Sequence, residues 1–87
     1  MDNSTRIEQM KQRLTAELSP THLEISDDSH LHAGHAGAKS GKGHFTVTIA
    51  SAQFAGKRSL LCHQMIYQAL GDMMTTDIHA LAIKVVD

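Results

Sequence analysis

Histidine is the residue type whose number and spacing in this sequence best indicate chemistry. Seven histidines occur in 87 residues, and four of them lie in residues 29–45, a stretch that also holds four of the six glycines. Imidazole is a common ligand for metals of borderline softness, and its charge changes near neutral pH. We therefore take residues 29–45, together with any histidine that can reach them, as the candidate functional region.

The composition of residues 27–43 predicts an exposed, mobile loop between two strands. Glycine and other small residues cannot bury enough apolar surface to offset the entropy of ordering the chain. Long loops in compact domains tend to be functional or disordered. This loop carries His30, His32 and His35 in an H-x-H-x2-H pattern, a weak metal signal because structural zinc sites usually have four ligands. Solvated histidines that bind nothing, or a simple metal buffer made of these three, are the alternatives.

His79 is the second candidate, and it lies at the start of the last predicted strand. By alternation, His79 would lie on the same side of the strand as the buried residues that follow. Its location at the first turn of the strand, however, is outward. A histidine there is most often a core-edge residue satisfied by one hydrogen bond. Alternatively, a rigid strand end can hold a metal ligand. A fixed His79 and a loop histidine would supply two of four ligands, so a partner would have to complete the site.

The remaining candidates carry weaker signals. Cys62 is the single cysteine, which excludes an intramolecular disulfide and a cysteine-only metal site within one chain. We interpret it as an ordinary helix residue, and we assign no role to His22 or His44 and a packing role to His63. The sequence has no nucleophile elbow, no P-loop and no paired carboxylates, so we do not predict an enzyme.

Composition indicates one small globular domain that spans residues 1–87. The apolar fraction is 41%, and eight basic residues nearly balance nine acidic ones. A net charge near zero argues against strong nonspecific binding to nucleic acid, and an aromatic content of 3% argues against a stacking platform for single strands. The sequence shows no signal peptide and no apolar run long enough to cross a membrane, so we expect a cytoplasmic protein.

Periodicity predicts the element order helix, strand, strand, helix, strand. An apolar stripe at Ile7, Met10, Leu14 and Leu18 marks the first helix, which Asn3 or Ser4 would cap and Ser19-Pro20 would end. Strands are expected at residues 21–26, 44–49 and 78–86, and a second helix at 58–70 after a turn at 51–56. In this helix, residues 61, 65 and 69 form one row and residues 60, 63, 67 and 70 the adjacent one.

These elements predict an α/β (α+β) fold. Its sheet would be three-stranded and mixed, with both helices on one face and the last strand parallel to its neighbour.

Five segments in this order resemble the BolA family: D-D-S-H-L-H (27–32), G-H-F-T-V-T-I (43–49), F-A-G (54–56), H-Q-M-I-Y-Q-A-L (63–70) and I-H-A-L-A-I (78–83). The resemblance covers nearly the whole chain. It implies a fold similar to class II KH domains but without their G-x-x-G clamp. It also implies a protein that is a monomer or a weak homodimer when alone.

The resemblance further implies a heterodimer with a monothiol glutaredoxin that bridges a [2Fe-2S] cluster. The glutaredoxin cysteine and a glutathione thiol would ligate from one side, and His79 with a loop histidine from the other. By position after the D-x-S segment His32 is the best match for the loop ligand, and His35 is the substitute. Mixed ligation by cysteine and histidine raises the cluster's potential, which suits cluster transfer or iron sensing.

Some members of this family are implicated in DNA binding as transcription regulators of stress response and cell morphology. The corresponding groups here are Lys57, Arg58 and Gln64, which could contact phosphates or bases through a helix-turn-helix-like region. The family often has basic residues on both sides of the helix histidine, whereas His63 is flanked by Cys62 and Gln64. This departure makes DNA binding the weaker of the two readings.

Overall fold

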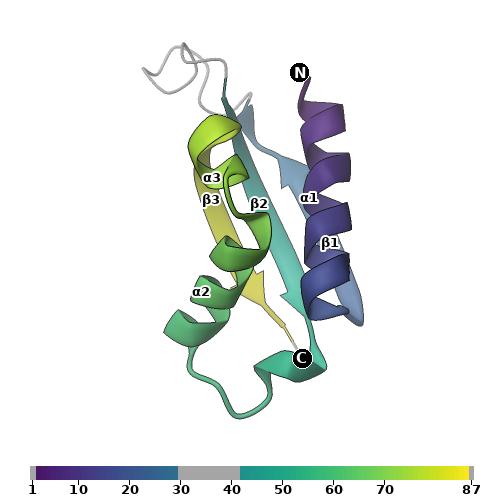
Figure 1. Cartoon of the computed structure of the whole chain (residues 1–87), viewed down its shortest axis with the longest axis vertical. Coiled ribbons are helices and arrows are strands. Elements are labelled where there is room, and N and C mark those ends of the chain that lie inside the picture. The colour runs from purple at the N-terminus through teal and green to yellow at the C-terminus, as the bar shows by residue number, and fades with distance from the viewer. Residues whose placement is uncertain (1, 30–41, 87) are drawn as a thin grey trace.

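A computed structural model of the chain describes residues 2–29 and 42–86. The elements that it contains are α1 (Asn3–Leu18), β1 (His22–Asp27), β2 (Gly43–Ala50), a 3-10 turn (Ala52–Phe54), α2 (Ser59–Leu70), α3 (Met73–Thr76) and β3 (Ile78–Val85) (Figure 1). The predicted order is confirmed, with α3 as an addition.

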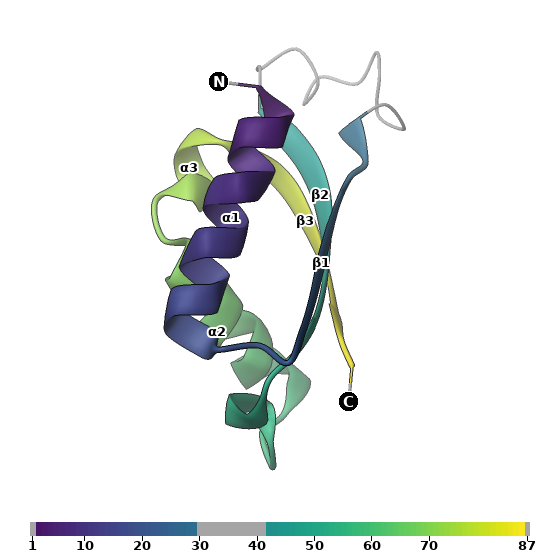
Figure 2. The same cartoon turned by 90° about the vertical axis from the view of Figure 1, so that its right-hand side faces the viewer.

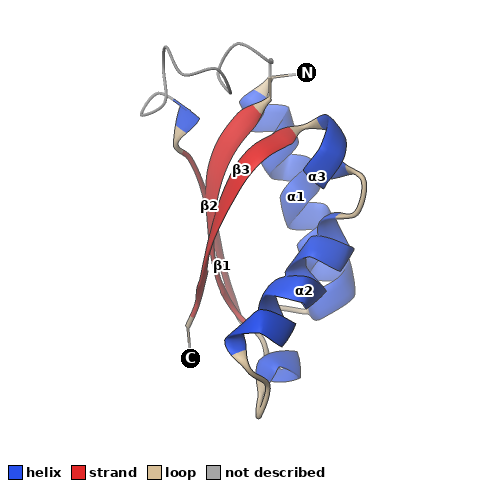
Figure 3. Cartoon of the chain, turned by 90° about the vertical axis from the view of Figure 1, so that its left-hand side faces the viewer, coloured by secondary structure: helices blue, strands red, loops and turns tan. Residues whose placement is uncertain are grey.

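The three strands form one mixed sheet in the order β1-β2-β3. β1 runs antiparallel to β2, and β3 runs parallel to it, as the crossover through α2 and α3 requires. All three helices lie on one face of this sheet, which is clear when it is seen edge-on (Figures 2 and 3). The predicted three-stranded sheet with helices on a single face is therefore confirmed.

The core fills the space between β2 and the two long helices. β2 is the central strand, and its inward side chains Phe45, Val47 and Ile49 are buried, as alternation predicts. α1 contributes Met10, Leu14 and Leu18, the stripe expected from the sequence, and Phe54 fills the core from the 3-10 turn. The inward residues of the edge strands β1 and β3 are mostly half-buried.

Among residues 2–29 and 42–86, no helix lies above the opposite face of the sheet, which carries mostly polar side chains (Figures 2 and 3). Two rows cross all three strands there. One row is Glu24, Thr48 and Lys84, and the other is Ser26, Thr46 and Ala82. Thr46 is held by a hydrogen bond that its hydroxyl donates to the Asp28 carboxylate. We call this surface the outer face.

The rotation of α2 differs from the expected one. The buried row is Cys62, Ile66 and Leu70, whereas Leu60 and Leu61 are exposed. Apolar side chains surround most of this helix, so their spacing alone does not single out one buried face. Packing against α1 and the sheet determines which row is buried, and it makes Cys62 a core residue.

The cap of α1 also differs from the prediction. Asp2 caps the helix, with its carboxylate accepting the backbone N–H of Thr5 at 2.8 Å, whereas Asn3 is the first helical residue. The predicted end is confirmed, because Ser19 adopts a left-handed conformation with φ of 45° immediately before Pro20. The Asn3 side chain therefore does not cap α1 and hydrogen-bonds to Asp27 at the end of β1 instead.

α3 was missed because the sequence around Gly71 indicates only a helix end. Gly71 has φ of 58°, a conformation that favours glycine, and the chain turns there before Met73 starts a new helical turn. The side chain of Met73 is buried in the core, which holds this short helix in place. Tertiary packing, rather than local propensity, accounts for the element.

Gly43 begins β2 at a point where the Phe45 ring folds back against it. A Cβ at residue 43 would lie 2.5 Å from Cε2 of Phe45 and 3.0 Å from Oδ1 of Asn3. Phe45 is only 2% exposed and cannot move aside without disturbing the core.

We expect Gly43→Ala to lower the free energy of unfolding by roughly 1–3 kcal/mol through this overlap. Urea denaturation followed by circular dichroism measures the change. Thr48→Ala, on the outer face of the same strand, is the matched control and should be close to neutral. An alanine at residue 43 that leaves the midpoint unchanged would contradict the close packing described here.

Candidate functional site

His79 lies on a β-bulge that turns its side chain out of the core. In the parallel pairing Gly43 is opposite Ile78, but His44 is opposite Ala80, so His79 is an additional residue in β3. Ile78 is buried, His79 and Ala80 are both exposed, and alternation resumes with a half-buried Leu81. The expected inward parity of His79 is therefore wrong, because one inserted residue shifts the alternation of the strand.

His44 is the immediate neighbour of His79 on the outer face. Their rings lie 5.1 Å apart between centroids with an angle of 53° between the planes. His44 is only 6% exposed, whereas His79 is accessible to solvent. We assigned His44 no role from the sequence. Its contact with His79 depends on the register of β2 and β3, including the bulge.

Hydrogen bonds fix both ends of the histidine-rich segment, residues 30–41, at the end of the sheet that carries His79. The backbone N–H of Asp28 donates to the His44 carbonyl at 2.8 Å, and the N–H of His44 donates to the Ser29 hydroxyl at 3.1 Å. The N–H of Gly43 donates to the Asp77 carbonyl at 2.9 Å. The chain therefore enters residues 30–41 beside His44 and leaves them next to the start of β3. The predicted ligands His32 and His35, and also His30, lie outside the described residues.

A polar network ties the start of α1 to this end of the sheet. The Asn3 amide donates to the Asp27 carboxylate at 3.0 Å and to the Ser29 hydroxyl at 3.1 Å. Arg6 donates to the Asn3 side-chain oxygen at 2.9 Å and to the Asp77 carboxylate at 3.2 Å. Asp27 and Ser29, from the D-D-S segment, thus act here as structural anchors.

The carboxyl group of Asp77 sits between two donors. The Thr76 hydroxyl donates to it at 2.8 Å, and the Arg6 guanidinium pairs with its other oxygen. The hydrogen bond from Thr76 lowers the pKa of Asp77, and the hydrogen bond and charge of Arg6 lower it further. The Arg6 and Asp77 side chains are 11% and 13% exposed, so solvent screens this ion pair only partly.

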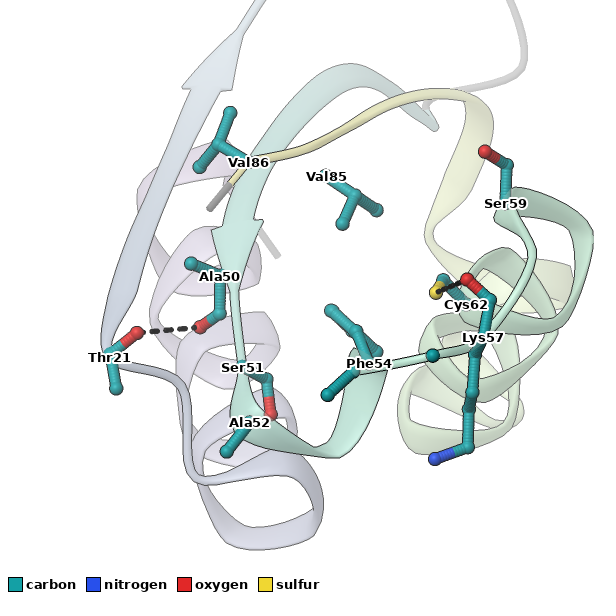
Figure 4. Close-up of a pocket in the computed structure, with 12 residues that line it drawn as sticks. Thr21, Ala50, Ser51, Ala52, Phe54, Lys57, Ser59, Cys62, Val85 and Val86 are labelled. Carbon is teal, nitrogen blue, oxygen red and sulfur yellow. Dashed lines mark hydrogen bonds between the residues drawn. The ribbon is translucent and has the colours of Figure 1, made fainter.

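Cys62 lies at the far end of β3 from His79. It lines a pocket of about 550 Å³ that is bounded by the 3-10 turn, the start of α2 and the last residues of β3 (Figure 4). The thiol is 2% exposed and lies 3.9 Å from the Lys57 carbonyl oxygen, to which it donates. Val85 lines the same pocket, six residues along the strand from His79, which corresponds to roughly 20 Å. Cys62 is therefore too distant to share a metal with His79.

The candidate DNA-contacting residues lie at this pocket end of the molecule. Lys57 and Arg58 directly precede α2, and Gln64 is in its second turn; all three are exposed. The Lys57 ammonium donates to the Gln53 carbonyl across the turn. The structure therefore separates the two candidate regions, with His79 at one end of the sheet and these polar residues at the other.

Among residues 2–29 and 42–86, no group of three or more histidine, cysteine, aspartate or glutamate side chains is arranged to hold a metal ion. Across the same residues, no helix is long and apolar enough to cross a membrane. The described part of the site thus consists of one exposed imidazole, the buried ring beside it and the fixed ends of the histidine-rich segment.

Comparison with known proteins matches this chain to one family. A family model described as BolA-like protein matches residues 14–86. The chain is 40% identical over 76 residues to the DNA-binding transcriptional regulator BolA of Escherichia coli (strain K12), covering 87% of this chain and 70% of that protein. It is also 40% identical over 81 residues to the protein BOLA1, chloroplastic, of Arabidopsis thaliana, covering 90% of this chain and 51% of that protein.

Solved structures agree with the sequence match. The BolA domain of SufE1 from Arabidopsis thaliana superposes with a TM-score of 0.81 at 36% identity, and the match covers 93% of this chain and 90% of that domain. The arrangement of one mixed sheet with helices on a single face is thus shared with a relative of substantial sequence identity.

The lowered pKa of Asp77 predicts how stability depends on pH. The folded-state pKa lies below the unfolded one, so the ionised carboxylate stabilises the fold at neutral pH, and this contribution is lost as the pH falls through the lowered pKa. We expect Asp77→Asn to reduce the free energy of unfolding by on the order of 1 kcal/mol above about pH 5. The difference from wild type should close on acidification below about pH 4.

Urea titrations between acidic and neutral pH measure this difference. Asp72→Asn, which removes the exposed ion pair with Arg13, is the control and should change stability little at any pH. A difference between wild type and Asp77→Asn that stays constant down to the acid limit would contradict the assigned pairing.

Proposed function

This chain belongs to the BolA-like protein family, and from that premise we propose that it is a non-enzymatic adaptor in iron–sulfur cluster handling. In this proposal it forms a heterodimer with a monothiol glutaredoxin, and the two proteins share a [2Fe-2S] cluster. The chain contributes His79 and one histidine of the segment 30–41. The glutaredoxin cysteine and a glutathione thiol supply the remaining ligands.

The observation that carries the proposal is the outward placement of His79 by the bulge. The residues before and after His79 are both paired with β2, so the backbone of His79 is held in position. Its side chain faces solvent rather than the core. The histidine-rich segment begins beside His44 and ends beside the start of β3. A fixed, exposed imidazole therefore lies at the end of the sheet where this segment starts and ends, and a second protein can approach it.

The donor chemistry of the described residues fits part of such a cluster. A [2Fe-2S] cluster takes four external ligands, and two histidines can replace two cysteines on one iron. His79 is a suitable donor, whereas Cys62 is buried at the opposite end and cannot serve. When bound, the cluster would supply one-electron redox chemistry and labile iron. The chain's own role is to present imidazole and to leave the thiolate positions to its partner.

His32 is the proposed loop ligand, and His35 is the substitute. Both come from the resemblance in sequence. Ser29 lies three residues before His32 and six before His35, and Asn3 and the backbone of His44 anchor it at the end of the sheet that carries His79, which supports a loop ligand from this segment. Single substitutions of each histidine would distinguish the two.

Reconstitution of the heterodimer tests this function. We expect a mixture of this protein, a monothiol glutaredoxin, glutathione, iron and sulfide to give a visible circular dichroism spectrum that differs from that of the glutaredoxin homodimer. His79→Ala should lower cluster occupancy of the heterodimer at least about tenfold, because it removes a direct ligand.

His22→Ala, which removes an exposed histidine of β1, is the matched control and should leave the spectrum unchanged. A wild-type spectrum from the His79→Ala protein would remove His79 from the ligand set. Full loading of this chain alone, without any thiol donor, would overturn the requirement for a partner.

DNA binding is a second candidate function, and two observations favour it. The relative of 40% identity in Escherichia coli is named a DNA-binding transcriptional regulator. Lys57, Arg58 and Gln64 are all exposed near the start of α2. A helix end with two cations can contact phosphates, although the net charge of −1 provides little nonspecific attraction.

Salt-titrated binding to promoter fragments tests this candidate. It predicts that affinity falls as salt rises, and that Lys57→Ala reduces the slope of log K against log salt by about one. Lys11→Ala, at an exposed position in the middle of α1, is the control and should keep the slope. Binding with no salt dependence, or no binding at low salt, would count against DNA as a ligand.

A further inference from the structure

We propose that His44 is a positioning residue for His79, and that its buried ring fixes the orientation in which the His79 imidazole is presented. This inference rests on the proposed function, because it assigns the group that prepares the fixed ligand for the cluster. It concerns a residue to which the sequence analysis gave no role.

The contact itself is the first support. The two rings are 5.1 Å apart between centroids and tilted by 53°, so the exposed imidazole lies against the ring of a residue that is 94% buried. An exposed side chain on a bulge would otherwise be able to turn among its rotamers. A rigid neighbour removes part of that freedom before any ligand binds.

His44 is held more firmly than its neighbour. Its strand is the central one, paired on both sides. Its carbonyl accepts the N–H of Asp28, and its own N–H donates to the Ser29 hydroxyl, which Asn3 also contacts. The backbone of His44 therefore cannot shift without breaking the network that joins α1 to the sheet. The ring is a fixed surface for His79.

Burial also decides between a positioning role and direct ligation. Both ring nitrogens of His44 are inaccessible to solvent, and a ligand nitrogen must reach a metal that a second protein also contacts. His79 meets that condition, and His44 in this conformation does not. Residues of this kind orient a ligand, and their substitution typically costs about tenfold or more in metal affinity.

Two variants test the role. His44→Thr removes the ring and introduces the residue type found at the next two outward positions of β2, Thr46 and Thr48, so the strand should form. His44→Phe keeps a planar ring without nitrogens. His22→Ala again serves as the matched control.

The first measurement uses the protein alone and is independent of any cluster. In wild type we expect nuclear Overhauser contacts between the two rings and a single orientation of His79. His44→Thr should increase the ring mobility of His79 in carbon-13 relaxation, while His44→Phe and His22→Ala should keep it low. An equally ordered His79 ring in His44→Thr would overturn the proposal.

The second measurement uses the reconstituted heterodimer. We expect His44→Thr to lower cluster affinity about tenfold and His44→Phe to restore most of the loss. Equal losses in both variants would show that the nitrogens, rather than the ring, matter, and would overturn a role in packing. If wild type forms no cluster, the proposed function fails, whereas the ring mobility of the protein alone still decides the role of His44.

Discussion

The pairing of β2 with both of its neighbours is the constraint on which the rest of the structure depends. It places Phe45, Val47 and Ile49 under the helices and fixes which residue of β3 lies opposite which residue of β2. The one irregularity in the parallel ladder occurs beside Gly43 and His44. Because the rest of β3 stays in register, the irregularity changes the direction of one side chain without loosening the core.

The end of the sheet near His79 is held by polar contacts, whereas the middle is held by apolar burial. Asn3 and Arg6 connect the first turns of α1 to the end of β1 and to the residue before β3. The dense packing of Phe45 against Gly43 lies directly beneath. This combination gives a rigid frame around a segment that is itself rich in glycine. Such a frame is suited to presenting side chains to another molecule without rearrangement of the domain.

Much of this architecture follows from the sequence, and the exceptions depend on contacts between segments that are distant in the chain. Alternation in β2 and the stripe of α1 identify their buried faces, because each has a single apolar side. The rotation of α2 does not follow, because Leu60, Leu61 and Ile66 make several of its sides apolar. The outward direction of His79 and its contact with His44 depend on one inserted residue in a ladder between distant segments. Local sequence patterns do not predict such pairing between distant segments.

In the described part of the chain no helix covers the outer face, and this has a consequence for association there. A molecule that approaches along the rows of Glu24, Thr48 and Lys84 meets hydroxyl groups and solvated charges, from which water is displaced at little gain. Shape complementarity and burial of apolar surface would then contribute little to the lifetime of such a complex. A complex built on this side would be held by a few directional bonds and would dissociate readily when those bonds break.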